Sequence, residues 1–227
     1  MKASYRFSVE IASASLKWIV GAVLPSLPTP GTSSFVELMA VLRPFGVDPQ
    51  HVTLATPTGK LSDVMFSVGV KNGAIRIQYT YSGIELVVEQ LADEYLNVLR
   101  DLADAAFNCV QPSAWKAASR YEARYMAHLR LESGISGEIL TARLAPVGTS
   151  GKLIPDAFAY RLVPNVNSIA NDLRVVLAQS ALLANGLWTD FTLSYPGSKE
   201  IGVVIDQARA DIVDTLSEFG LELVERK

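Results

Sequence analysis

The sequence predicts an α+β protein made of two tandem copies of one module, each a strand, a helix, three or four strands and a long closing helix. Alternating apolar and polar residues, which are typical of half-buried strands, twice precede a stretch with helical spacing along the 227 residues. Short sequence matches also recur in the same order in both halves. We therefore expect a first module at 1–112 and a second at 113–227, each with an antiparallel sheet packed on its long helix.

Composition and charge limit the classes of protein that fit. Hydrophobic residues make up 49% of the chain and charged residues 19%, close to the globular average, which predicts a packed core. The longest apolar run, Leu16 to Leu24, is interrupted by Lys17 and is shorter than the roughly 20 residues of a membrane span. The start of the chain lacks the apolar region of a signal peptide, and the single cysteine, Cys109, allows no intrachain disulfide. We expect a cytoplasmic protein with no membrane partner.

The first half opens with an alternating strand. One face of this strand carries Tyr5, Phe7, Val9 and Ile11. A capping box from Ser34 to Glu37 predicts the start of a short helix that ends near Gly46. Strands are predicted at 51–55, 64–70 and 74–81, with a hairpin turn at Asn72-Gly73. The segment 84–88 fits a fourth strand or a helix start equally well, and 91–107 has the spacing of a long amphipathic helix.

The second half repeats this succession. A longer alternating strand is predicted at 120–132, followed by a short helix at 138–145. Further strands are predicted at 157–163, 173–181 and 188–195, with an Asn-rich loop at 164–172. The closing helix is predicted to bury an apolar stripe of Ile205, Ala208, Ile212, Val213, Leu216 and Phe219.

Matches between the halves are the ground for inferring a duplication. The matching segments are 87–90 with 204–207, 81–83 with 195–197, 72–73 with 185–186, and 59–61 with 151–153. The shift varies along the chain, which requires an insertion in the second copy, and loops accommodate most insertions. Chance is the alternative, because any two amphipathic helices share a period. The ordered series of matches favours duplication.

Each predicted module has the order strand, helix, three or four strands, long helix. This order resembles the β-α-β4-α module of the TATA-binding-protein-like fold, which also occurs in tandem. The likeness covers the order of the elements and includes no sequence motif. It implies antiparallel sheets that each pack on a long helix, and it carries no implication for function.

Sequence motifs for common chemistries are incomplete. Lys60 and Lys152 each follow a glycine but precede leucine, where a phosphate-binding loop needs the hydroxyl of Ser or Thr for magnesium. The chain has two histidines, His51 and His128, and one cysteine, too few for an ordinary zinc site. For Cys109, a buried structural role is favoured over a catalytic pair with His128. The sequence predicts no catalytic residue, no metal and no cofactor.

The candidate binding site is a row of basic side chains on the strand at 120–132, named here the arginine strip. The arginine strip consists of Arg120, Arg124, His128 and Arg130. Its residues share one face, while odd-numbered residues such as Tyr125 form the apolar reverse face. Such a strip fits an anion or an acidic partner. The alternative is a solvent-facing surface with cross-strand salt bridges, and exposed pairs of that kind contribute only about 0–1 kcal/mol each.

Three classes of function remain compatible with the sequence. The leading one is a non-catalytic binding or assembly protein that uses the polar face of its sheets, with a protein partner or in a homo-oligomer. A carrier of a small apolar ligand is the second, and its pocket would be lined by Tyr79, Tyr95, Phe107, Trp188 and Phe191. An enzyme of unidentified type is the third. With 20 Lys and Arg against 23 Asp and Glu, we expect no tight binding to nucleic acid.

Overall fold

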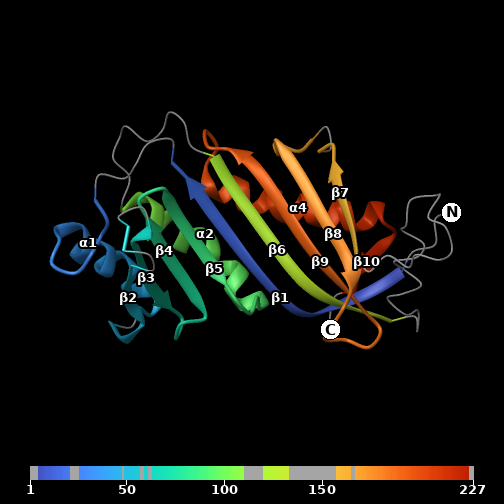
Figure 1. Ribbon diagram of the computed structural model, residues 1–227, viewed down its shortest axis with the longest axis horizontal. Coiled ribbons are helices and arrows are strands. Elements are labelled where there is room, and N and C mark those ends of the chain that lie inside the picture. The colour runs from blue at the N-terminus through green and yellow to red at the C-terminus, as the bar shows by residue number, and fades with distance from the viewer. Residues whose placement is uncertain are drawn as a thin grey trace. The chain divides into compact units, whose positions relative to one another are not determined.

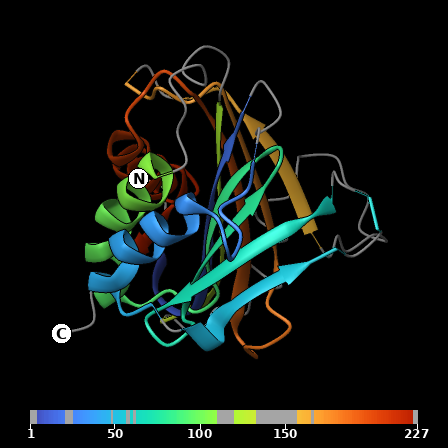
Figure 2. The ribbon, with the colours of Figure 1, turned by 90° about the vertical axis from the view of Figure 1, so that its left-hand side faces the viewer.

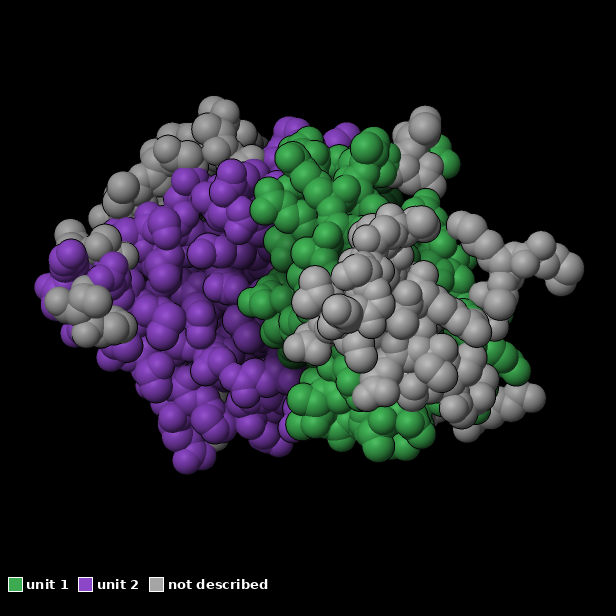
Figure 3. Space-filling view, turned by 45° about the vertical axis from the view of Figure 1, so that its right-hand side comes forward, with its two compact units in different colours: residues 1–13, 124–193, 207–227 green, residues 14–123, 194–206 purple. Residues whose placement is uncertain are grey.

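The computed structural model describes residues 5–20, 26–47, 49–56, 59–60, 63–109, 120–132, 157–164 and 167–224. These residues form a mixed α+β structure with a large antiparallel sheet and three helices, which confirms the predicted class (Figure 1). The chain divides into two compact units: unit 1 contains residues 1–13, 124–193 and 207–227, and unit 2 contains 14–123 and 194–206 (Figure 3). None of the described helices is long and apolar enough to cross a membrane.

The unit 2 sheet is built from neighbouring antiparallel strands. Its strands are β2 (Val52–Ala55), β3 (Met65–Val70), β4 (Ile75–Thr80), β5 (Gly83–Val88) and the last residues of β1 (Tyr5–Ile19). They hydrogen-bond in the order β2-β3-β4-β5-β1. Glu85 of β5 lies between Gln78 of β4 and Lys17 of β1, so the segment 83–88 is a strand and not a helix start.

Two helices, α1 (Ser33–Leu42) and α2 (Asp93–Asn108), cover the apolar face of the unit 2 strands (Figure 2). The predicted stripe of α2 is buried at Leu99, Leu102, Ala103, Ala106 and Phe107. The ring of Phe107 packs 5.5 Å from that of Trp18 on β1, between centroids. The hydroxyl of Tyr79, a fully buried residue of β4, donates to the carbonyl oxygen of Ala106 at 3.2 Å. Both contacts hold α2 against the sheet.

Helix α1 begins before the predicted capping box. Thr32 is the N-cap residue, and its Oγ1 accepts a hydrogen bond from the backbone N–H of Phe35 at 3.2 Å. A capping box needs a glutamate at the third helical position, which is Phe35 when Thr32 is the N-cap. Glu37 lies in the second turn and therefore forms no capping box. The prediction of a cap at Ser34 is therefore wrong. The predicted end is close: a single 3₁₀ turn follows α1, and Gly46 stops it with a φ of 71°.

The unit 1 sheet has its own strand order. Its strands are the first residues of β1, most of β6 (Arg120–Leu131), β7 (Ala157–Leu162), β8 (Asp172–Gln179), most of β9 (Gly186–Pro196) and β10 (Leu221–Leu223). The hydrogen-bonding order is β1-β6-β9-β8-β7, and β10 pairs with β1 in parallel. The sequence analysis missed β10, which has three residues and therefore no readable period. The helix predicted at 138–145 lies outside the described residues.

Helix α4 (Ile201–Glu218) buries only part of the predicted stripe. Its buried residues in unit 1 are Ala208, Asp211, Thr215 and Leu216. Val213, which we placed in the stripe, is 46% exposed. The buried Asp211 carboxylate accepts hydrogen bonds from Ser168 Oγ at 2.8 Å and Gln207 Nε2 at 2.9 Å, and these bonds offset the cost of removing it from water. A polar side chain with its own partners occupies a core position here, so hydrophobic spacing misplaces the face.

The buried side of β1 changes along the strand. Phe7 is buried as predicted, but Ile11 is 45% exposed, so the predicted apolar face of Tyr5, Phe7, Val9 and Ile11 is wrong. Farther along, the even-numbered residues Ala12, Leu16 and Trp18 are buried instead. The first residues of β1 pair with β10 in unit 1, and the last pair with β5 in unit 2. One strand therefore serves two packing environments.

Strand order, and not the sequence matches, supports the predicted duplication. In each half the first strand pairs with the strand that precedes the long closing helix, and the order then runs back along the chain, as β1-β5-β4-β3 and as β6-β9-β8-β7. The matched segments, however, occupy different elements: Val87-Val88 ends β5 whereas Val204-Ile205 lies within α4. Asn72-Gly73 connects β3 with β4, while Asn185-Gly186 leads into β9. The duplication of 1–112 and 113–227 stays a prediction.

Replacing Gly83 by alanine tests the register of β5 on β1. A Cβ at this position would lie 2.1 Å from the backbone oxygen of Trp18, which cannot move without breaking the ladder. We expect Gly83→Ala to lower the free energy of unfolding by about 3 kcal/mol in a urea titration, the upper part of the usual range for overpacking. Ser82→Ala is the control, since Ser82 is exposed and should change stability by less than about 0.5 kcal/mol. Equal effects of the two substitutions would contradict the register.

Candidate functional site

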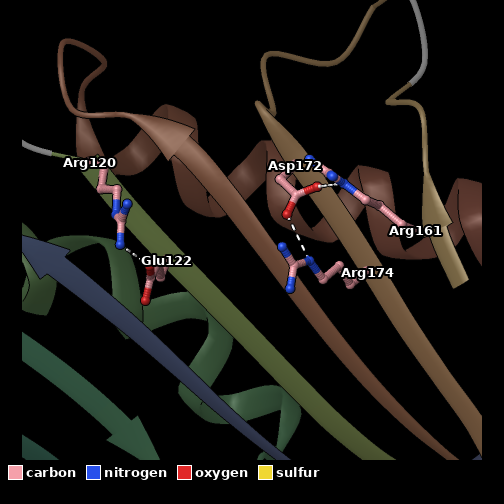
Figure 4. Close-up of polar contacts among 5 residues, drawn as sticks. All are labelled: Arg120, Glu122, Arg161, Asp172 and Arg174. Carbon is pink, nitrogen blue, oxygen red and sulfur yellow. Dashed lines mark hydrogen bonds and ion pairs between the residues drawn. The ribbon is translucent and has the colours of Figure 1, made fainter. Parts of the chain in front are cut away.

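Alternation along the unit 1 strands separates a core face from a polar face. On β9, Leu187, Thr189, Phe191 and Leu193 are buried, so Asp190 and Thr192 project to the other side. On β8, Val175 and Leu177 are buried, which places Arg174 on that other side. We call this side, which is turned away from α4, the outer face (Figure 4). It brings together residues of β6, β7, β8 and β9.

Strand β6 has the predicted parity. Its buried residues are Tyr121, Ala123, Ala127, Leu129 and Leu131. Tyr125 is only partly exposed, its ring lies 6.3 Å from that of Phe191, and burial raises the pKa of its hydroxyl to about 12. Arg124, His128 and Arg130 therefore share the outer face of unit 1. The fourth residue of the arginine strip, Arg120, belongs to unit 2.

The arginines of the arginine strip are paired with carboxylates of the same chain. Arg124 donates from Nε and Nη2 to the two carboxylate oxygens of Asp190, at 2.9 and 2.6 Å. The Nε of Arg130 lies 3.3 Å from Glu10, and Nη2 of Arg120 lies 2.8 Å from Glu122. Each of these guanidinium charges is therefore already balanced by a carboxylate. The pairing favours the alternative interpretation of the arginine strip, a surface held by salt bridges.

His128, on β6, is hydrogen-bonded to the turn between β8 and β9. Its Nδ1 lies 2.8 Å from the Oγ of Ser180, which is a buried residue. The same oxygen accepts the backbone N–H groups of Leu182 at 3.2 Å and Leu183 at 2.9 Å. Since both lone pairs of the hydroxyl are occupied, its proton is directed to Nδ1. A serine engaged in this way fixes the turn between β8 and β9 and is a poor nucleophile.

A second arginine cluster, which sequence analysis did not single out, lies on β7 and β8. Arg161 donates its Nε to Oδ1 of Asp172 at 2.7 Å, and Arg174 donates its Nε to Oδ2 at 2.9 Å (Figure 4). The hydrogen bond from Arg161 lowers the pKa of the Asp172 carboxyl, and the bond from Arg174 adds to this effect although partial burial opposes it. The carboxylate is therefore ionised at neutral pH. The sequence signal for this cluster was only Asp172-x-Arg174, two residues on one face of a strand.

The remaining candidates have structural roles. Cys109 is partly buried, and burial together with nearby Glu37 raises the pKa of its thiol, which disfavours the thiolate that a nucleophile needs. Trp188 and Phe191, two residues proposed to line a carrier pocket, lie on opposite faces of β9. Tyr79 and Phe107 are packed between α2 and the unit 2 strands. These positions favour core packing over a ligand pocket.

The salt bridges of Arg124 and Arg130 should differ in energy, which revises the sequence expectation for Arg124. Asp190 is 12% exposed and would lose two hydrogen bonds in Arg124→Ala, so we expect a loss of about 1–3 kcal/mol in the free energy of unfolding. Arg130→Ala is the matched control, since its more distant pair with Glu10 should contribute about 0–1 kcal/mol. Urea titrations of both variants measure the difference. Equal losses would show that the Arg124–Asp190 fork does not form.

No family model matches the chain, and no curated protein matches it. The function therefore has to be argued from the arrangement of its own side chains.

Proposed function

We propose that this protein is a non-catalytic binding protein that contacts a protein partner through the outer face of the unit 1 sheet. The main observation behind this proposal is that the outer face presents arginines from three strands together with apolar side chains. The arginines are Arg124, Arg130, Arg161 and Arg174, and the apolar side chains are Met126, Val176 and Trp188. Arginine, methionine and tryptophan are the residues enriched in the centres of protein interfaces.

Pairing prepares these arginines for recognition. A carboxylate that holds a guanidinium in one orientation lowers the conformational entropy that binding would otherwise cost. The side chains stay accessible: Arg124 is 51% exposed and Arg130 59%. A guanidinium retains further N–H donors in such a pair, and these suit acceptors on a partner. The outer face thus combines ordered donors with apolar area.

The chemistry of the described side chains favours binding over catalysis. The hydroxyl of Ser180 is occupied by two backbone amides and His128, and burial keeps the Cys109 thiol protonated. Two groups that would otherwise be candidates for nucleophilic catalysis are therefore engaged in packing and turn formation. The carrier alternative gains no support, since its proposed lining residues are packed in the core or separated by β9.

Two finer expectations belong to the same proposal. We infer from the repeated strand order that the chain is a duplicated module with a TATA-binding-protein-like arrangement. We also infer a location in the cytosol, from the absence of a cysteine pair. Neither inference enters the argument for the outer face, which depends on unit 1 alone.

A photo-crosslinking experiment in the native cell tests the proposed interface. Benzoylphenylalanine would replace Thr192 or Ala159, both exposed on the outer face, and in a separate variant Val213, which is 46% exposed on α4. We expect one discrete protein adduct from each of the two outer-face positions, because a specific partner covers both. Position 213 should give no adduct of that mass.

The adduct pattern decides the proposal. Each variant is first shown to unfold at the same temperature as the parent protein, so that loss of an adduct cannot be due to misfolding. Adducts of the same mass from position 213, or no discrete adduct from 159 and 192, would contradict an interface on the outer face.

A further inference from the structure

We propose that Arg161 and Arg174, held by Asp172, form a binding site for one carboxylate group of an acidic segment of the protein partner. This assignment rests on the proposed function and names the chemistry that the outer face recognises. It involves none of the residues of the arginine strip.

Strand register places the two arginines together. Arg161 of β7 and Arg174 of β8 are directly opposite each other in the antiparallel ladder. Side chains in such positions have Cβ atoms about 5 Å apart, and two like charges there destabilise a sheet. One carboxylate, Asp172, lies on the same face two residues before Arg174 and reaches both guanidinium groups. The cluster therefore holds two positive charges and one negative charge.

The geometry of the bonds leaves the ends of both arginines available. Arg124 uses Nε and Nη2 on a single carboxylate, which is a complete fork. Arg161 and Arg174 each use only Nε on Asp172, within the residues that the structure describes. Their side chains are 73% and 62% exposed, whereas Asp172 is 24% exposed. Both guanidinium groups are therefore largely exposed, with the Asp172 carboxylate between them (Figure 4).

Charge selects the ligand. The pKa of the Asp172 carboxyl is lowered, so this group is ionised at neutral pH. The cluster of two arginines and one aspartate therefore has a net charge of +1. One carboxylate makes the cluster neutral and presents two oxygens to the planar donor edges of arginine. A phosphodiester also carries one charge, but nucleic acid is bound by many phosphate contacts, and this chain has an overall charge of −3. An acidic side chain of a protein fits better.

The test follows the Nε–H signals of the arginines by nuclear magnetic resonance in the full-length protein. The probes are a nine-residue peptide that alternates glutamate with serine, its glutamine counterpart, inorganic phosphate, and a short DNA duplex, all at equal ionic strength. We expect the glutamate peptide to shift the signals of Arg161 and Arg174 saturably, with an affinity about fivefold higher than that of the glutamine peptide, the value of one exposed ion pair. The signal of Arg209, an exposed residue of α4, is the internal control and should stay unchanged.

Variants separate the site from general charge attraction. Arg161→Gln and Arg174→Gln should each remove the preference for glutamate. Arg209→Gln, which removes the same charge from an exposed position on α4, should retain it. Equal affinities of the two peptides, or loss of the preference in Arg209→Gln, would overturn the carboxylate site. Larger saturable shifts with phosphate or DNA would also overturn it, in favour of a phosphoryl ligand. If positions 159 and 192 give no discrete photo-adduct while the preference for glutamate is found, the proposed interface is contradicted and the carboxylate site is not. If the adducts form but the preference is absent, only the carboxylate site is contradicted.

Discussion

Neighbouring residues of a β-strand must point to opposite faces of the sheet, and this constraint decides where each functional candidate of unit 1 lies. Phe191 is fully buried on β9, and its neighbour Asp190 must then project outward, where it meets Arg124. Leu173 and Val175 are buried on β8, so Arg174 between them cannot be. The core determines the polar face residue by residue. No separate interaction is needed to orient the arginines outward.

Strand parity was predictable from the sequence where one strand packs in one environment, because it depends only on a local period of two. Strand β6 follows the predicted alternation, whereas β1 departs from it at Ile11. Strand ends and turns were also close, since Asn-Gly and Gly-containing turns have strong local preferences. The buried face of helix α4 was partly mispredicted because Asp211 is buried with two hydrogen-bond donors from other positions, which hydropathy does not represent. The cap of α1 was missed because Thr32, two residues before Ser34, is also a good N-cap residue and accepts from the amide of Phe35.

Pairing partners could not be predicted, because they depend on register between segments far apart in the chain. Arg124 meets Asp190, 66 residues later, and nothing local marks Asp190 as its partner. Arg161 meets Arg174 only because the loop between β7 and β8 sets them opposite each other. The number of carboxylates per arginine differs between two parts of the outer face. On β6, each arginine has its own carboxylate, so its charge is balanced. On β7 and β8, two arginines share one carboxylate, which leaves one positive charge for a ligand. This difference moves the candidate site from β6, where the sequence put it, to β7 and β8.

The proposed binding surface requires that the outer face of the unit 1 sheet is exposed, and two adjacent valines on β8 test this directly. Val175 is fully buried, while Val176 lies on the outer face. In the full-length protein, a soluble gadolinium chelate should broaden the methyl resonances of Val176 much more than those of Val175, since paramagnetic relaxation falls steeply with distance. Equal broadening of the two valines, or stronger broadening of Val175, would contradict the assignment of the faces and with it the proposed binding surface.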